Sequence, residues 1–185
     1  MTEKEKMLKG ELYLAFDEEL LNERNKAKEL LFDFNNVRPS DLEQKEAMLK
    51  NILGKSGKGI HIEAPFYCDY GYNIEVGDNF YANHHCIILD GAKVKIGNNV
   101  FLAPNVSLFT AGHPIDAQRR NEGWEYAHPI TIGDDVWIGG NTVINPGVTI
   151  GSNVVIGSGS VIVKDIPSNT IAVGNPCKPI KTIES

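Results

Sequence analysis

Histidine side chains are the first candidates for chemistry in this sequence, because the ordinary pKa of imidazole places its charge change near neutral pH. The five histidines are His61, His84, His85, His113 and His128. His113 stands between Gly112 and Pro114, at the start of a segment that interrupts a regular pattern. In such a loop its side chain can reach a cleft and remove a proton as a general base, or it can bond to the backbone nearby.

The remaining histidines and the cysteines do not have the spacing of a metal site. Successive histidines are 23, 1, 28 and 15 residues apart, so no pair has the step of a His-x4-His motif. Cys68, Cys86 and Cys177 lack Cys-x-x-Cys spacing, and their odd number argues against a disulfide framework. We therefore expect no metal and three free thiols, with His84 and His85 at the edge of a cleft.

Asn83 directly precedes the histidine pair and is the second candidate. An amide donates to one oxygen and accepts from another, so this side chain suits a reacting hydroxyl or a tetrahedral intermediate. Asparagine is equally suited to a turn with a left-handed backbone conformation. The residues alone leave both interpretations of Asn83 open.

Apolar residues at six-residue spacing dominate the second half of the chain. Six isoleucines keep one register without interruption: Ile132, Ile138, Ile144, Ile150, Ile156 and Ile162. Glycine and polar residues between them suit tight turns. This period predicts a coiled parallel sheet in which each coil stacks about 4.8 Å above the last. A sandwich of short strands would instead place its turns about every 8 to 12 residues.

A weaker form of the same period covers the middle of the chain. It includes Val76, Ala82, Ile88 and Val94, and then slips by two residues to Ile96, Leu102 and Leu108. An irregular stretch at 109–129 breaks the repeat, and insertions into repeat proteins form surface loops that often lie on the binding face. We divide the chain into a helical segment 1–55, an all-β solenoid 56–166 with the inserted loop 109–129, and a C-terminal cap 167–185.

The first 55 residues are rich in charge and poor in glycine and proline, which favours helices. Apolar residues recur there at helical spacing: Leu20, Ala27, Leu31 and Phe34. Ser40 and Glu43 match a capping box that opens a further helix, and Gly54 ends it. We expect two or three amphipathic helices that pack on the solenoid.

Length and charge exclude several classes of protein. The chain of 185 residues suits one domain, and its net charge of −6 argues against nucleic acid or an anionic membrane as the main partner. The first residues contain no apolar run of a signal peptide, and no stretch approaches a membrane span. We therefore expect a cytoplasmic protein.

Several motifs together resemble the hexapeptide-repeat sugar O-acetyltransferases of the maltose and galactoside type. They are GELY (10–13), CDYGYNI (68–74), FYANHH (80–85), LAPNV (102–106), GHPID (112–116), PITIGDDVWIGG (129–140), NPGVTIG (145–151), KDIP (164–167) and GNPCKPIK (174–181). The resemblance covers essentially the whole chain. It implies acetyl transfer from acetyl-CoA to a sugar hydroxyl, in a left-handed parallel β-helix that forms a homotrimer with sites between subunits.

The resemblance also implies roles for the two first candidates. His113 matches the catalytic histidine of the family, which removes the hydroxyl proton and can then protonate the departing CoA thiolate. Asn83 matches an asparagine that contacts the reacting hydroxyl. The group that orients His113 stays open among Glu122, Glu125 and a backbone carbonyl.

Binding residues follow from the same resemblance. Hydrogen bonds to the sugar are expected from Asp17, Arg24, Asp69 and Asn83, with Tyr81 as a stacking surface. Asp17 also suits the start of a helix, where the macrodipole favours a negative charge. CoA contacts are expected from Trp137, Gly140, Ser158 and Val163, with Lys164, Lys178 and Lys181 near the phosphates and the Gly140 amide as oxyanion donor.

Two alternatives remain. The first is a CoA-dependent acyltransferase that acts on another acceptor, such as a chitooligosaccharide, an amino sugar or a drug. The second is a non-catalytic β-helix scaffold that binds a partner through its helical segment. The acceptor cleft around Asp69 and the histidine pair distinguishes among acceptors, whereas CoA binding distinguishes an enzyme from a scaffold.

Overall fold

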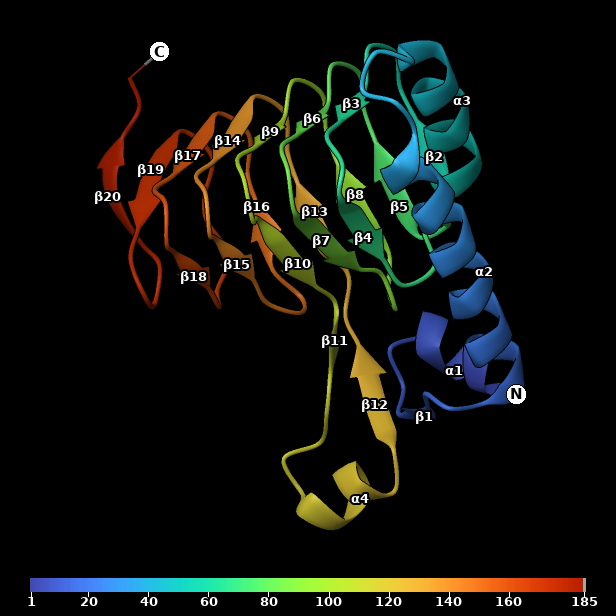
Figure 1. The fold of residues 1–185 in the computed structure, drawn as a ribbon. Coiled ribbons are helices and arrows are strands. Elements are labelled where there is room, and N and C mark those ends of the chain that lie inside the picture. Colours follow the sequence, from blue (N-terminus) through green and yellow to red (C-terminus); the bar gives the residue numbers. More distant parts are fainter. Residues whose placement is uncertain (185) are drawn as a thin grey trace.

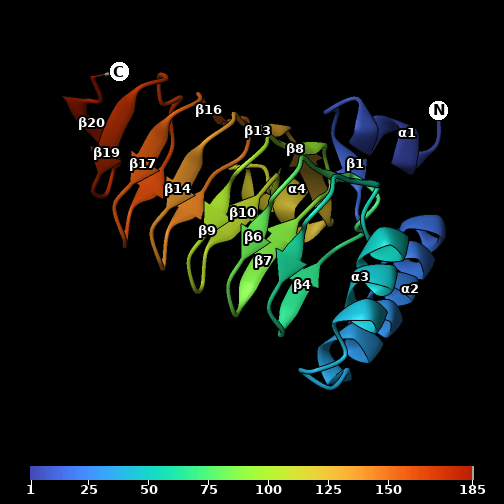
Figure 2. The ribbon, with the colours of Figure 1, turned by 90° about the horizontal axis from the view of Figure 1, so that it is seen from above.

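The computed structural model describes residues 1–184 and consists of stacked coils of short parallel strands, with helices at one end (Figure 1). The strands of the coils form three sheets, which are the three faces of a prism. The hexapeptide repeats fit a left-handed β-helix, which confirms the predicted fold class. Viewed from above, the coils follow one another from the helices to the C-terminus (Figure 2).

The sheets are made of strands that recur once per coil. One sheet contains β4 (Phe66–Cys68), β7 (Cys86–Leu89), β10 (Ser107–Phe109), β15 (Val143–Ile144) and β18 (Val161–Ile162). The second contains β2 (Lys55–Ser56), β5 (Ile74–Val76), β8 (Val94–Ile96), β13 (Ile130–Ile132) and β16 (Thr149–Ile150). The third contains β3 (His61–Ile62), β6 (Tyr81–Ala82), β9 (Phe101–Leu102), β14 (Val136–Ile138), β17 (Val154–Ile156), β19 (Thr170–Val173) and β20 (Lys178–Thr182).

The six-residue period builds the core of the coils. All six isoleucines of the strict register are buried, and each pairs with the isoleucine one coil away, as Ile132 does with Ile150. The turns are held by a second periodic feature, a ladder of asparagine and aspartate side chains. Asn79 donates to Asn99 and Asn99 to Asp135, each at 2.9 Å, and all three have positive φ. These stacked side chains therefore stabilise the left-handed turns at one edge.

The helices are α1 (Glu3–Leu8), α2 (Glu18–Asn36) and α3 (Leu42–Ile52). The last two cover the first coil (Figure 1). The predicted apolar face of α2 is buried, and its Phe34 belongs to the same core as Leu49 of α3 and the first strands. The predicted capping box at Ser40 is wrong, because Asp41 is the N-cap of α3 and accepts from the Gln44 amide at 3.1 Å.

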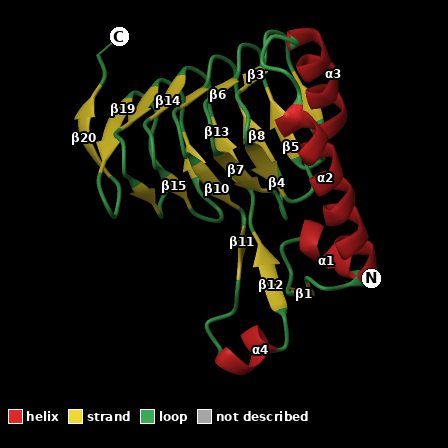
Figure 3. Ribbon diagram, viewed as in Figure 1, coloured by secondary structure: helices red, strands yellow, loops and turns green. Residues whose placement is uncertain are grey.

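The inserted segment is more regular than the sequence indicated. It forms an arm that leaves the coils along β11 (Ala111–Gly112), turns through α4 (Ala117–Asn121) and returns along β12 (Trp124–Ala127) (Figure 3). The N-terminal strand β1 (Tyr13–Leu14) pairs with β12 and completes a small antiparallel sheet. Backbone pairing across the arm therefore gives it order that its composition does not predict.

The C-terminal residues add one more parallel strand to the third sheet and then reverse direction. β19 pairs in parallel with β17, and β20 runs antiparallel to β19. Among residues 1–184, no helix is long and apolar enough to cross a membrane.

Candidate active site

Two edges of the prism carry most of the predicted site residues. The Asn83 edge comprises the turns that follow the β6 sheet, at 63–65, 83–85, 103–106, 139–142 and 157–160. The His113 edge comprises the turns that follow the β7 sheet, at 69–73, 90–93, 110–129, 145–148 and 163–165. The 4 residues of β7 separate the two edges, which corresponds to about 13 Å.

His113 lies at the root of the arm with its side chain 52% exposed. Its Nδ1 is 3.3 Å from the carbonyl oxygen of Trp124 on the returning strand. A carbonyl only accepts, so this contact places the proton of the neutral ring on Nδ1 and the lone pair on Nε2. Nε2 is 3.7 Å from Oε1 of Glu125. Of the groups considered as orienters, Glu122 instead contacts the indole nitrogen of Trp124 at 3.2 Å.

Glu125 is held from the far end of the chain. The Tyr13 hydroxyl donates to Oε2 of Glu125 at 2.9 Å, and the same two residues are register partners between β1 and β12. Tyr13 is buried, and its pKa is raised by burial and by the Glu125 carboxylate. The N-terminal segment therefore forms part of the wall beside His113, a contribution that no motif in the sequence indicated.

Arg24 and Asp69 lie together at this edge. The Arg24 guanidinium donates to the Tyr70 hydroxyl at 2.6 Å and to the Ala15 carbonyl at 2.5 Å. Burial raises the pKa of Asp69, Arg24 opposes that rise, and the Glu125 carboxylate adds to it. Arg24 and Glu125 therefore both act on the Asp69 carboxyl, and the contact of Arg24 and Asp69 with an acceptor stays a prediction.

Asp90 is a carboxylate at this edge that sequence reasoning missed. It is fully buried and accepts from the backbone amides of Asp69 at 3.1 Å, Tyr70 at 2.8 Å and Asn73 at 3.3 Å. Burial raises its pKa to about 6, although the amide donors favour the charged form. Asp90 therefore fixes the turn that carries Asp69 and Tyr70, and only the chain fold brings these groups together.

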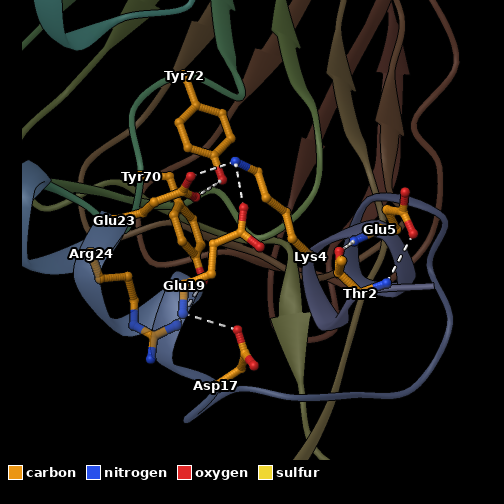
Figure 4. A network of polar contacts seen from close by, with 9 residues as sticks. All are labelled: Thr2, Lys4, Glu5, Asp17, Glu19, Glu23, Arg24, Tyr70 and Tyr72. Carbon is orange, nitrogen blue, oxygen red and sulfur yellow. Dashed lines mark hydrogen bonds and ion pairs between the residues drawn. The ribbon is translucent and has the colours of Figure 1, made fainter.

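The helices supply a polar network behind Arg24 (Figure 4). Lys4 forms ion pairs with Glu19 and Glu23, and Tyr72 donates to Glu23 at 2.7 Å. Asp17 is the N-cap of α2 and accepts from the Glu19 amide at 3.1 Å. The structure thus gives Asp17 a local role in the helix start, and its contact with an acceptor stays a prediction.

A small pocket lies beside Asp17. Its volume is about 240 Å³, and its lining includes Phe16, Asp17 and the arm residues Glu122 and Gly123. The side chain of Phe16 is largely exposed there. The pocket therefore lies between the start of α2 and the arm.

Asn83 lies on the other edge, after β6. Its Oδ1 accepts from the amide of His84 at 2.8 Å, and among residues 1–184 its Nδ2 has no partner. The neighbouring His84 ring donates to the Ala64 carbonyl at 2.6 Å, while His85 has a φ of 62°. Asn83 therefore stabilises its own turn and keeps one amide group free to donate.

Two predicted CoA residues share the Asn83 edge. Gly140 and Ser158 follow β14 and β17, one coil apart. Within the described residues, the Gly140 N–H has no acceptor, and a Cβ at this position would lie 3.1 Å from the Pro104 carbonyl oxygen. A Cβ on Gly159 would meet nothing within 4 Å. These turns therefore leave the backbone accessible to an extended ligand.

Aromatic side chains follow one another along the outer face of the third sheet. Tyr81, Phe101 and Trp137 are register partners on β6, β9 and β14, and Trp137 is 56% exposed. Tyr81 stacks on His61 with a centroid distance of 5.6 Å. Tyr81 therefore belongs to this aromatic row, and its stacking on an acceptor stays a prediction.

The remaining predicted CoA residues are dispersed. Val163 and Lys164 are exposed at the His113 edge, after β18. Lys178 and Lys181 are exposed on β20, where Lys181 pairs with Ile171. One chain thus brings His113, Arg24 and Asp69 to one edge, and places Asn83, Gly140 and Ser158 at another. Among residues 1–184, no group of three or more histidine, cysteine, aspartate or glutamate residues is arranged to hold a metal ion.

Comparison with known proteins defines the class. Residues 6–57 match the maltose acetyltransferase hexapeptide capping motif, and residues 129–164 match the bacterial transferase hexapeptide with six repeats. The galactoside O-acetyltransferase of Escherichia coli K12 is 45% identical over 179 residues, which are 97% of this chain and 88% of the relative. These matches identify a hexapeptide-repeat acetyltransferase.

Solved structures agree over the whole chain. A maltose O-acetyltransferase from Clostridium difficile 630 superposes with a TM-score of 0.99 at 58% identity, covering 100% of this chain and 99% of that one. A galactoside acetyltransferase in complex with coenzyme A gives a TM-score of 0.96 at 45% identity, with 100% and 92% coverage. The chain belongs to the sugar O-acetyltransferases of the maltose and galactoside type.

Proposed function

We propose that this protein transfers the acetyl group of acetyl-CoA to a hydroxyl of a sugar of the maltose, glucose or galactoside type. The observation that carries the proposal is the arrangement of His113, whose Nδ1 meets the Trp124 carbonyl and whose Nε2 faces the space bounded by Glu125. Relatives in complex with coenzyme A or acetyl coenzyme A support the donor.

The chemistry follows from the tautomer of His113. Nε2 accepts the proton of the acceptor hydroxyl while its oxygen attacks the thioester carbonyl carbon. The protonated ring then donates the proton to the CoA sulfur as the C–S bond breaks, so the products are the acetylated sugar and CoA with a free thiol. The Nδ1 contact keeps the ring orientation fixed throughout.

Asn83 and Gly140 are proposed to act on the charge that develops on oxygen. The Gly140 N–H is positioned to donate to the thioester oxygen as it becomes negative, and Asn83 Nδ2 is free to hold the reacting hydroxyl. Donors of this kind act most strongly in a site from which water is excluded. Support comes from two N–H groups that lack acceptors at the same edge of the described chain.

Acceptor binding is assigned to Arg24, Asp69 and Asn83, with Asp17 and Tyr81 as outer contacts. Arg24 and Asp69 lie near the His113 edge. Burial raises the pKa of Asp69, and the charge of Arg24 opposes that rise. CoA binding is assigned to the turns and to exposed basic residues: Trp137, Gly140, Ser158, Val163, Lys164, Lys178 and Lys181. Lysine ammonium groups at the C-terminal end suit the CoA phosphates.

We propose that the working unit is a homotrimer with its sites between subunits. Within one chain, the strand β7 separates Asn83 from the His113 edge by about 13 Å, which is too far for both to contact one hydroxyl. A second copy that presents its Asn83 edge to the arm would close this gap. In this arrangement, the segment 1–55 supplies Arg24, the solenoid 56–166 supplies both edges, and the cap 167–185 supplies basic residues.

The test is CoA release from acetyl-CoA with a panel of maltose, glucosides and galactosides, measured with a thiol reagent. The native enzyme should release thiol with at least one sugar, and His113→Ala should lower that rate by about 10²- to 10⁴-fold. No thiol above the His113→Ala level with any sugar would refute the proposal. Release with chitooligosaccharides or amino sugars alone would favour the other-acceptor alternative, and failure to bind CoA in calorimetry would favour the scaffold.

A further inference from the structure

Glu125 has one carboxylate oxygen that is bonded and one that is free. Oε2 accepts from the buried Tyr13 hydroxyl at 2.9 Å. Among residues 1–184, Oε1 accepts no hydrogen bond, and it lies 3.7 Å from Nε2 of His113. The side chain is 21% exposed, so this oxygen is partly shielded and yet reachable. An acceptor atom with free lone pairs therefore stands beside the atom proposed to take the hydroxyl proton.

This geometry differs from a carboxylate that orients a histidine. An orienting carboxylate accepts from the ring N–H, but here the backbone carbonyl of Trp124 takes the Nδ1 proton. Glu125 instead lies on the side of Nε2, where the neutral ring has no hydrogen. Two acceptor atoms 3.7 Å apart can each accept from a different hydroxyl, and neighbouring hydroxyls of a sugar ring supply two such hydrogens.

The surroundings of Glu125 belong to the predicted acceptor region. Its carboxylate contributes to the raised pKa of Asp69 and to that of Tyr70, which burial and nearby charges raise to about 12. Arg24 donates to Tyr70 and opposes both effects. Glu125 therefore acts electrostatically on Asp69, which is proposed to bind the sugar, and on Tyr70, which holds the proposed sugar ligand Arg24.

We propose that Glu125 accepts a hydrogen bond from the sugar hydroxyl next to the one that is acetylated, with Tyr13 as its positioning residue. The inference rests on the proposed function and adds a residue that selects acceptors with a neighbouring hydroxyl. The reacting hydroxyl donates to Nε2 of His113, and its neighbour donates to Oε1 of Glu125. Because this contact exists before and during transfer, its loss acts mainly on acceptor binding.

The experiment uses the sugar that gives the fastest CoA release and its monodeoxy analogues. Glu125→Ala should raise the acceptor KM by about 10- to 100-fold with kcat nearly unchanged, as expected when a hydrogen bond to a charged group is lost. One deoxy analogue should be a poor acceptor for the native enzyme, and Glu125→Ala should no longer distinguish it from the parent sugar. Glu125→Gln, whose amide can still pair with a hydroxyl, should recover part of the affinity.

Matched variants separate this role from a structural one. Tyr13→Phe removes the donor to Oε2 and should raise the acceptor KM less than Glu125→Ala does. Arg119→Ala changes an exposed side chain of the same arm and should leave both constants unchanged. CoA affinity, measured by calorimetry, should be the same in all variants, which would show that the chains are folded.

Three results would overturn the inference. If Glu125→Ala has the same acceptor KM and kcat as the native enzyme, Glu125 does not bind the sugar. If its kcat falls while KM is unchanged, Glu125 stabilises the protonated ring of His113 instead. The inference would also be contradicted if each deoxy analogue lost the same activity, relative to the parent sugar, with Glu125→Ala as with the native enzyme. If the native enzyme releases no CoA with any sugar, the proposed function fails first, and the inference fails with it.

Discussion

The Tyr13 hydroxyl donates a hydrogen bond of 2.9 Å to Glu125 across a separation of 112 residues. The backbone of β1 also pairs with β12, so the N-terminal segment holds the arm by backbone and side-chain hydrogen bonds. His113 stands on the outgoing side of the same arm and meets the Trp124 carbonyl on the returning side. The position of the proposed base therefore depends on both sides of the arm and on an N-terminal strand that is distant in the sequence.

Complementation tests whether Asn83 and His113 of different chains form one site. Asn83→Ala and His113→Ala should each be inactive. When the two are unfolded together and reassembled in equal amounts, activity should return to about a quarter of the native value, because that share of interfaces joins a native Asn83 to a native His113. If both groups act within one chain, the mixture will stay inactive. Reassembled native protein is the control for recovery.

Substitutions at Asp69 and Lys178 should separate the two halves of the cleft. Asp69→Asn should raise the acceptor KM by about tenfold and leave CoA affinity unchanged, because the lost charge lies beside Arg24 at the His113 edge. Lys178→Ala should weaken CoA about threefold to tenfold, with a larger effect at low ionic strength, because the lysine is exposed. Steady-state kinetics and calorimetry measure the two effects, and a reversed pattern would show that the halves are misassigned.

Asp90 should give the native state a pH-dependent stability. Burial raises its pKa to about 6, whereas an unfolded aspartate titrates near about 3.9. Between these values the native state keeps a proton that the unfolded chain has lost, so the stability that Asp90 contributes is complete below about pH 4 and is lost as the pH rises through about 6. The difference between the two pKa values corresponds to about 3 kcal/mol.

Urea unfolding from about pH 4 to pH 7 checks this sign. The free energy of unfolding of the native protein, relative to Asp90→Asn, should fall across that range by an amount of order 3 kcal/mol. The comparison with Asp90→Asn removes the contributions of other carboxylates. A relative stability that is constant or rises with pH would contradict the buried, proton-retaining state of Asp90.

Gly112 should be sensitive to a single methyl group. A Cβ there would lie 2.5 Å from the Tyr126 hydroxyl oxygen and 2.6 Å from its ring, on the facing strand of the arm. Gly112→Ala should therefore displace the Tyr126 ring at the root of the arm and lower kcat by about tenfold, because catalysis depends on the placement of His113. Adding Tyr126→Ala removes the clash and should recover activity relative to Gly112→Ala. If the double variant is no better than the single one, the effect does not arise from this contact.

The sequence by itself determined the coiled architecture, because inward residues at six-residue spacing are a local pattern that each coil repeats. All six isoleucines of the register are buried, and the apolar face of α2 packs where helical spacing placed it. The family could also be recognised from the sequence, because its motifs are short and contiguous. These features need only neighbouring residues, and the hydrophobic effect acts on them without reference to distant contacts.

Only the tertiary structure decided which side chains meet. The predicted capping box at Ser40 was wrong because Asp41, one residue later, is an equally suitable N-cap and takes that position. The arm is ordered because β1 supplies backbone partners from another part of the chain. Asp90 and Tyr13 carried no signal, since a buried carboxylate or phenol is stabilised only by donors and acceptors that the fold brings to it. The separation of Asn83 from His113 has the same origin, because the length of β7 decides how far apart two turns of one coil lie.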